Sequence, residues 1–142
     1  MRPEELMDIV KKVLDDNNHT LGLQYISFGD DTLVPKYPAA LIIYDGVQRD
    51  IHGTHYFLTD LTVDIVLMHA DLSLNRQERT RADLELATAV VQLIHNKGMT
   101  LADSRIHKAF VVSEEPSTIA TSNITAIGTS LSINAQVREA FK

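Results

Sequence analysis

Cysteine and tryptophan are both absent from this chain of 142 residues. Without cysteine the protein forms no disulfide, no thiolate metal site and no cysteine nucleophile, and its composition fits a reducing compartment. Glycine and proline are scarce, with 6 and 4 residues, and no low-complexity segment or internal repeat interrupts the chain. With 44% hydrophobic residues, the length suffices for one ordinary core, so a single domain spanning residues 1–142 is predicted.

Positive charge is also in short supply, because 13 Lys and Arg residues face 19 Asp and Glu residues. The resulting net charge of −6 does not suit a surface that neutralises a phosphate backbone, so specific binding of nucleic acid is not expected. No apolar run reaches the ~18 residues that a membrane-spanning helix needs. The first residues are acidic where a secretory signal carries positive charge, so we expect synthesis in the cytoplasm and no membrane partner.

Familiar catalytic and ligand-binding motifs are missing, including the glycine-rich nucleotide loops and the Gly-x-Ser-x-Gly elbow. His52 and His55 flank a glycine, but no carboxylate follows at a spacing typical of metal ligands. Asp60 and Asp64 would lie roughly 13 Å apart along a strand, beyond the ~5–9.5 Å of glycosidase carboxyl pairs. The sequence therefore predicts no catalytic residue, no metal ion and no cofactor. A divergent enzyme that uses His52, His55 or Asp64 remains an alternative.

Hydrophobic periodicity predicts an α+β fold. The pattern indicates a helix from Pro3 to about Asn17 and a second over residues 76–96, with Gly98 as its left-handed cap. Strands are predicted at residues 23–28, 39–44, 54–70, 106–113 and 127–138, whereas the polar stretch 114–123, which contains Pro116, is expected to be a loop. We expect a mostly antiparallel sheet of about four to five strands with both helices packed on one face.

The long strand at residues 54–70 is the most informative segment. Its odd positions are mostly apolar and are predicted to face the core, whereas its even positions are polar only in the middle, at Asp60, Thr62 and Asp64. The apolar even positions at the two ends should be covered by another element or another subunit; they are Tyr56, Leu58, Val66 and Met68. Such a strand would span roughly 50 Å, whereas a domain of this length has a radius of gyration of about 14 Å.

The strand must therefore bend at a bulge or project together with its neighbour, as a long β-hairpin arm around residues 40–69. Asp45 and Gly46 form a turn signal, but residues 47–51 are also compatible with a strand that continues past a bulge. In the second case the tip of the hairpin lies at His52 and Gly53.

Positive charge is densest at the start of the second helix, at Arg76, Arg79 and Arg81. Asp83 and Glu85 follow Arg79 and Arg81 by four residues and can pair with them on a helix, so one interpretation is that these arginines lie on a solvent-exposed face. The alternative is a docking patch for an acidic partner or a neighbouring subunit, because the planar guanidinium group suits ion pairs at interfaces. Arg76 and Arg105 have no obvious local partner. The candidate interface residues are Arg76, Arg79, Arg81, Arg105, Tyr56 and Leu58.

The layout resembles the tail terminator proteins of long-tailed bacteriophages, also called tail completion or minor tail proteins. Four segments carry the resemblance: the initial helix, the approach to a strand at residues 37–43, the long strand from His55 to His69, and the helix start at residues 75–81 that leads to Ala87, Val90 and Val91. The resemblance covers most of the chain as a pattern.

In that family an α+β domain forms a hexameric ring that closes the tail tube and joins it to the head. The resemblance implies a virion protein without catalytic residues, whose partners are other copies of itself, the tail tube protein and a head-completion or connector protein. Asp60, Thr62 and Asp64 would then line a channel through which DNA passes without specific binding. Another head-to-tail neck protein and a non-viral small-ligand binding module are the alternatives.

Overall fold

The computed structural model describes residues 1–29, 36–51, 56–69, 76–98, 102–120 and 125–140. The helical elements are α1 (Pro3–Asp16), α2 (Asn18–Leu21), α3 (Arg76–Leu93) and the π-helical turn η1 (Ile94–Gly98) that continues α3. The strands are β1 (Tyr25–Phe28), β2 (Ala39–Ile51), β3 (Tyr56–His69), β4 (Ile106–Ala120) and β5 (Thr125–Ala140). Gly98 thus ends the helical segment itself.

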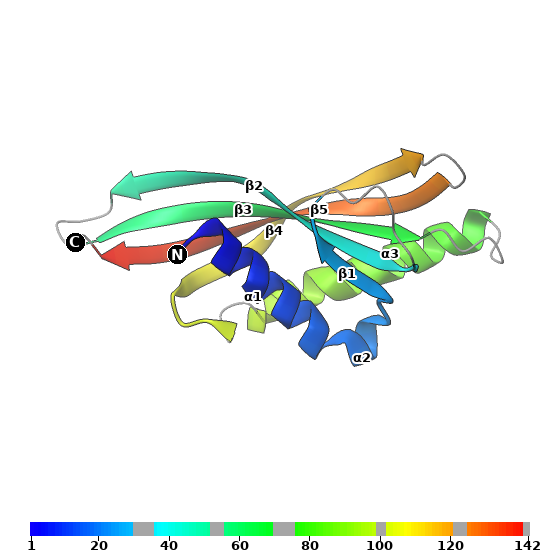
Figure 1. Cartoon of the computed structure of the whole chain (residues 1–142), viewed down its shortest axis with the longest axis horizontal. Helices are drawn as coiled ribbons and strands as arrows, with labels where there is room; N and C mark the ends of the chain where they lie inside the picture. Colours follow the sequence, from blue (N-terminus) through cyan, green and yellow to red (C-terminus); the bar gives the residue numbers. More distant parts are fainter. Residues whose placement is uncertain (30–35, 52–55, 70–75, 99–101, 121–124, 141–142) are drawn as a thin grey trace.

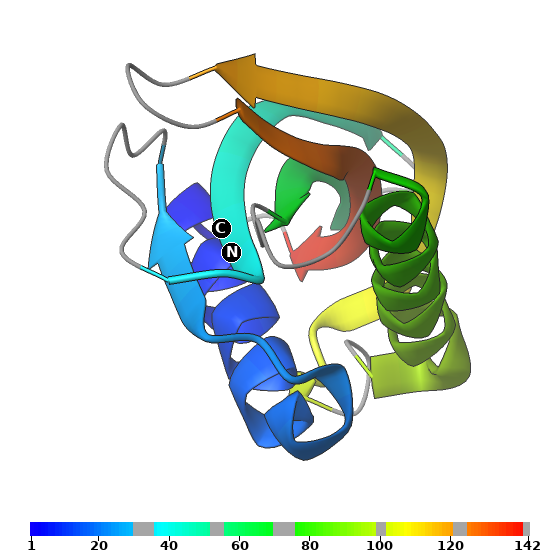
Figure 2. The same ribbon diagram turned by 90° about the vertical axis from the view of Figure 1, so that its right-hand side faces the viewer.

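The strands form one five-stranded sheet in the order β1-β2-β3-β5-β4. In the described part of the chain, β1 and β2 pair in parallel, and the other neighbouring strands pair antiparallel. The sheet is long and strongly twisted (Figure 1), and α1 and α3 pack on the same side of it (Figure 2). The prediction of a mostly antiparallel α+β fold with two helices on one face is confirmed.

The core lies between this helical layer and one face of the sheet. On β3, residues at odd positions from Thr59 to Leu67 are buried, and the even positions between them are half-buried. On β5 the same alternation buries Leu131, Ile133, Ala135 and Val137. The helices complete the cluster with Leu6, Val10, Val13 and Leu14 of α1 and with Leu86, Ala87, Val90 and Ile94 of α3. Burial of alternate residues fixes the strand register, because a slip by one residue would turn the apolar set to solvent.

The central strand β3 has the length that its sequence predicts. Its 14 residues span roughly 45 Å and pair with β2 on one side and with β5 on the other. Figure 1 shows the ends of β2, β3 and β5 extending beyond the first turn of α1, on the side of the molecule opposite to the start of α3. We call this region, where Ile51, Tyr56 and Ala140 end or begin their strands, the projecting end.

The two strands of the predicted arm pair along their whole length, from Ala39 opposite Met68 to Ile51 opposite Phe57. The register shifts between Tyr44 and Gly46, so β2 continues past a bulge and does not turn there. Gly46 has a φ of 147°, a backbone conformation that favours glycine. The bulge alternative is therefore confirmed, whereas the predicted tip at His52 and Gly53 lies outside the described residues.

The strand β4 corrects the prediction of a loop at residues 114–123. It pairs with β5 from Ile106 to Ala120, so only residues 121–124 separate the two strands and lie outside the description. Pro116 lies opposite Thr129 on β4, which is an edge strand, the place in a sheet where proline is usually found. The polar sequence follows from this position, since Glu114, Glu115 and Pro116 are exposed.

A second, smaller cluster covers the His69 end of β3 on the face away from the helices. Leu41 and Met68 are buried there, and Tyr25, Tyr37 and Val66 pack against them. The expected cover for Val66 and Met68 thus comes from the same chain. The side chains of Tyr56 and Leu58, at the other end of the strand, lie outside the description.

Candidate functional site

The sheet face that α1 and α3 leave uncovered, here called the open face, carries the residues predicted to line a channel. Asp60, Thr62 and Asp64 alternate with the buried residues of β3 and are half-buried. In register beside them on β5 lie Gln136, Asn134 and Ser132. The middle of the open face is therefore polar.

The surroundings of Asp64 on the open face perturb its pKa. Burial raises the pKa of its carboxyl above the ordinary value, a hydrogen bond from Ser132 partly offsets this rise, and the negative charges of Asp45 and Glu115 add to it. Its Oδ1 atom is buried and has no hydrogen-bond partner among the described residues. Carboxylates from β2, β3 and β4 therefore share one electrostatic environment, although no metal-ligand group of three or more His, Cys, Asp or Glu occurs in the described part of the chain.

Asp60 lies nearer to the projecting end and accepts a hydrogen bond of 3.4 Å from the side-chain amide of Gln136. Gln136 pairs in register with Lys108 of β4, whose ammonium group lies 6.0 Å from the centroid of the Phe110 ring. Among the described side chains of the open face, carboxylates thus outnumber the one lysine at its edge. This balance disfavours tight contact with a phosphate backbone.

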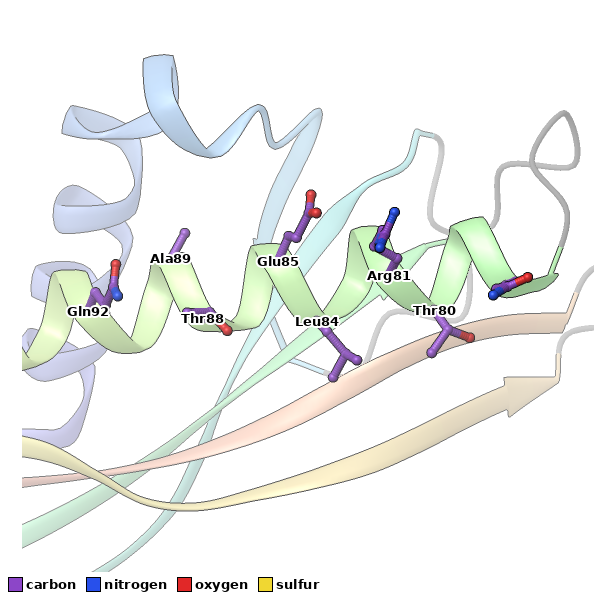
Figure 3. Close-up of a pocket in the computed structure, with 8 residues that line it drawn as sticks. Thr80, Arg81, Leu84, Glu85, Thr88, Ala89 and Gln92 are labelled. Atoms are coloured by element: carbon purple, nitrogen blue, oxygen red, sulfur yellow. The ribbon is translucent and has the colours of Figure 1, made fainter.

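A shallow groove of about 930 Å³ runs along the outer surface of α3. Figure 3 shows Arg81, Glu85 and Ala89 on one side of the helix and Thr80, Leu84 and Thr88 on the other. Leu84 is 58% exposed, an unusual position for a leucine on a helix whose opposite side is packed in the core. We call this surface the α3 groove.

A buried polar network fastens the first half of α3 to the sheet. Asp83 of α3 lies 3.3 Å from Nδ1 of His69, at the end of β3, and accepts a hydrogen bond of 2.7 Å from Oγ1 of Thr129 on β5. All three side chains are buried. A small pocket of about 230 Å³ lies beside His69, and Thr20, Pro38 and Glu85 also line it.

Sequence reasoning missed this network, because its members come from three segments far apart in the chain. One signal was available. Asp83 falls among the apolar residues of a helix that packs on the sheet, and a carboxylate on a buried face is retained only with partners.

The candidate interface residues lie in different parts of the molecule. Arg81 is exposed and lines the α3 groove, whereas Arg76 and Arg79 begin α3 with side chains that lie outside the description. Tyr56 and Leu58 belong to β3 at the projecting end. Within one chain, the predicted interface residues therefore do not lie together.

Arg105 has a local partner in Asp103, two residues before it, so the expectation that it lacks an obvious local partner is wrong. Its guanidinium group donates to Glu5 at 2.8 Å and to Asp103 at 2.8 Å, and thereby joins α1 to the segment before β4. Hydrogen bonds from Arg105 lower the pKa of the Asp103 carboxyl, and bonds from Arg2 and Arg105 lower that of Glu5. Sequence reasoning missed the bond to Glu5 because 100 positions separate the two residues.

His52 and His55 lie outside the described residues.

No helix in the described part of the chain combines the length and the apolar character that a membrane crossing requires. Comparison with protein-family models finds no match, and comparison with curated proteins finds none.

Proposed function

We propose that this protein is a structural virion protein that closes the tail tube of a long-tailed phage as an oligomeric ring, hexameric in the resembled family, and joins it to the head or connector. The observation that supports this most is the two-layer architecture whose central strands project past the helical layer. A projecting group of strands offers a subunit an exposed surface for a neighbour. Ring formation requires such contacts between unlike surfaces that close by rotation.

The open face supports the passage of DNA through the ring. Asp45, Asp60, Asp64 and Glu115 belong to this face or adjoin it, and repulsion between carboxylates and phosphates keeps DNA from adhering. Asp60, Thr62 and Asp64 line the channel in this proposal. The residues in register with Asp60, Thr62 and Asp64 on β5 are the uncharged polar residues Gln136, Asn134 and Ser132.

Imaging of the purified protein by negative stain, together with native mass spectrometry, tests the ring. We expect closed rings with a central hole that bind the ends of isolated tail tubes. A protein that stays monomeric at all concentrations and binds no tail tube contradicts the proposal. Rings that bind capsids or connectors but not tail tubes point to another neck protein.

Charge reversal tests the channel separately. Asp60→Lys and Asp64→Lys should leave ring formation intact but slow DNA passage during infection, because the ring then attracts the phosphate backbone. Glu114→Lys on the exposed edge strand is the matched control. If neither change on the open face affects DNA passage, the proposal that this face lines a channel is wrong, but the proposal that the protein forms a ring is not contradicted.

A small-ligand binding module is the second candidate, and the pocket beside His69 favours it. This pocket of about 230 Å³ is lined by a histidine, a threonine and a glutamate, and ligand sites typically place a small number of polar groups around a cavity. A thermal-shift screen with a metabolite panel distinguishes the two functions. A stabilising compound that loses its effect in His69→Phe would support the binding module.

A further inference from the structure

A pocket of about 440 Å³ lies within the helical layer, where α1 and α3 both end. The end of α1, the end of α3 with η1, and the segment before β4 each contribute residues to it. Its apolar lining consists of Val13, Leu93 and Ala102, and its polar lining of Lys12, Asp16, Asn17 and Asn96. Its volume falls within the roughly 300–1,000 Å³ that small-molecule sites occupy.

Lys12 and Asp16 line this pocket without forming an ion pair with each other. One position earlier on α1, Lys11 and Asp15 have the same spacing and do form an ion pair, of 3.2 Å. Among the described residues, neither Lys12 nor Asp16 has another ionic partner. Asp16 also lies in the last turn of α1, where a carboxylate opposes the helix dipole and no basic residue offsets it. The described part of the chain therefore leaves two opposite charges at the pocket without partners.

Two side-chain amides line the same pocket. The Nδ2 atom of Asn17 donates a hydrogen bond of 2.8 Å to the backbone carbonyl of Val13, which leaves its Oδ1 atom as an acceptor. Asn96 belongs to η1, and π-helical turns are frequent at functional sites. The pocket thus combines one ammonium group, one carboxylate and two amides around an apolar floor.

Hydrogen bonds hold the walls of this pocket in place. His95 of η1 accepts a bond of 2.9 Å from the backbone N–H of Val111, which ties η1 to β4. The segment before β4 is tied to α1, because Arg105 donates to both Asp103 and Glu5. The pocket is therefore pre-organised, as small-molecule sites usually are.

We propose that this pocket binds a free α-amino acid with an apolar side chain. The carboxylate of the ligand pairs with Lys12, and its ammonium group pairs with Asp16 beside the negative end of the α1 dipole. The apolar side chain packs against Val13 and Leu93. This inference goes beyond the proposed ring and does not depend on it, and it concerns a different pocket from the one beside His69.

Isothermal titration calorimetry on the wild-type protein tests the class of ligand. At least one of L-valine, L-leucine and L-phenylalanine should bind saturably, with a Kd of about 1 mM or below. The amide of that amino acid lacks the carboxylate, and its N-acetyl derivative lacks the ammonium group. Each should bind at least about tenfold more weakly, because each loses one charge-assisted interaction. If none of the three amino acids binds, or if both derivatives bind as tightly as the parent, the proposal is wrong.

Variants of α1 test the location of the site. Lys12→Gln and Asp16→Asn should each raise the Kd at least about tenfold. Lys11→Gln and Asp15→Asn are the matched controls, because they remove the same charges one position earlier and should leave the Kd unchanged. Without ligand, all four variants should keep a thermal midpoint close to that of the wild type, since none of these side chains is buried.

Equal Kd values for the Lys12 and Lys11 variants would contradict the proposed site. Binding that is lost in His69→Phe but kept in Lys12→Gln would also overturn it, because the ligand would then occupy the pocket beside His69. Imaging tests the ring separately. A protein that binds an amino acid but forms no ring contradicts the ring alone, and a ring that binds no amino acid contradicts the ligand site alone.

Discussion

Removal of Asp83 should destabilise the fold far more than removal of any exposed carboxylate on the same helix. Asp83 accepts from Thr129 at 2.7 Å and contacts Nδ1 of His69 at 3.3 Å, and it is only 6% exposed. Asp83→Ala leaves two buried polar groups without their partner, and each orphaned group costs about 1–3 kcal/mol. The free energy of unfolding should therefore fall by roughly 2–6 kcal/mol, a large part of the usual total.

Urea denaturation followed by far-UV circular dichroism measures this loss. The midpoint should fall at constant slope, because the change affects stability and not the surface exposed on unfolding. Thr129→Val removes one donor and should cost about 1.5–3 kcal/mol, since the lost bond goes to a carboxylate. In a double-mutant cycle, Asp83→Ala and Thr129→Val should be non-additive by about 0.5–3 kcal/mol.

Glu85→Ala is the matched control, because Glu85 lies on α3 two residues away and is exposed. Its effect should stay within about 0.5 kcal/mol. If Asp83→Ala costs no more than Glu85→Ala, the buried network does not fasten α3 to the sheet, and the reasoning is refuted.

Three further predictions concern single positions. Asp64→Asn should stabilise the protein at neutral pH. Because the pKa of the Asp64 carboxyl is higher in the folded state than in the unfolded state, the free energy of unfolding of the wild type falls as the pH rises from below 3.8 through the folded pKa. Urea unfolding at pH 4 and pH 7 should show that the variant loses this pH dependence. Gly128→Ala should cost about 3 kcal/mol or more in the same assay, because a Cβ there would overlap the backbone carbonyl of Leu67, whereas an unchanged midpoint would contradict that close approach. Arg105→Gln should lower the thermal midpoint only slightly, and 1 M salt should abolish the difference from wild type, since its ion pairs with Glu5 and Asp103 are exposed; a salt-independent loss would mean that packing dominates.

The parts of the fold that sequence predicts best are the strands with one buried face. Residues 61–67 and 131–137 alternate strictly between buried and half-buried positions, because one side packs on the helices and the other does not. The second half of β4 was not predicted as a strand, because it lacks such a buried face. An edge strand with exposed side chains at Glu114, Glu115 and Pro116 has no apolar face, so its sequence carries no period of two.

The candidate site, too, could be predicted from the sequence only in part. The shared face of Asp60, Thr62 and Asp64 follows from the strand period alone and is confirmed. The raised pKa of Asp64 could not be predicted from the sequence. It depends in part on Asp45 of β2 and Glu115 of β4, which come close to Asp64 only through the register of the sheet.

The candidate interface was predicted as residue types without their relative positions. The clustering of Arg76, Arg79 and Arg81 is visible in the sequence, but their distance from Tyr56 is not. That distance depends on the direction in which α3 lies along the sheet, which the Asp83 network and the packing of Leu86 and Val90 determine.

The position of β3 in the middle of the sheet also decides how the domain bears mechanical load. β3 is bonded on both sides, to β2 from Phe57 to Met68 and to β5 from Tyr56 to His69. A pull directed along the strand, from the projecting end towards α3, acts on these two ladders in shear, so that many hydrogen bonds resist together. A pull across the sheet would open them one at a time. A domain pulled along β3 therefore resists unravelling, and its weakest points under load are the ends of the sheet and not its centre.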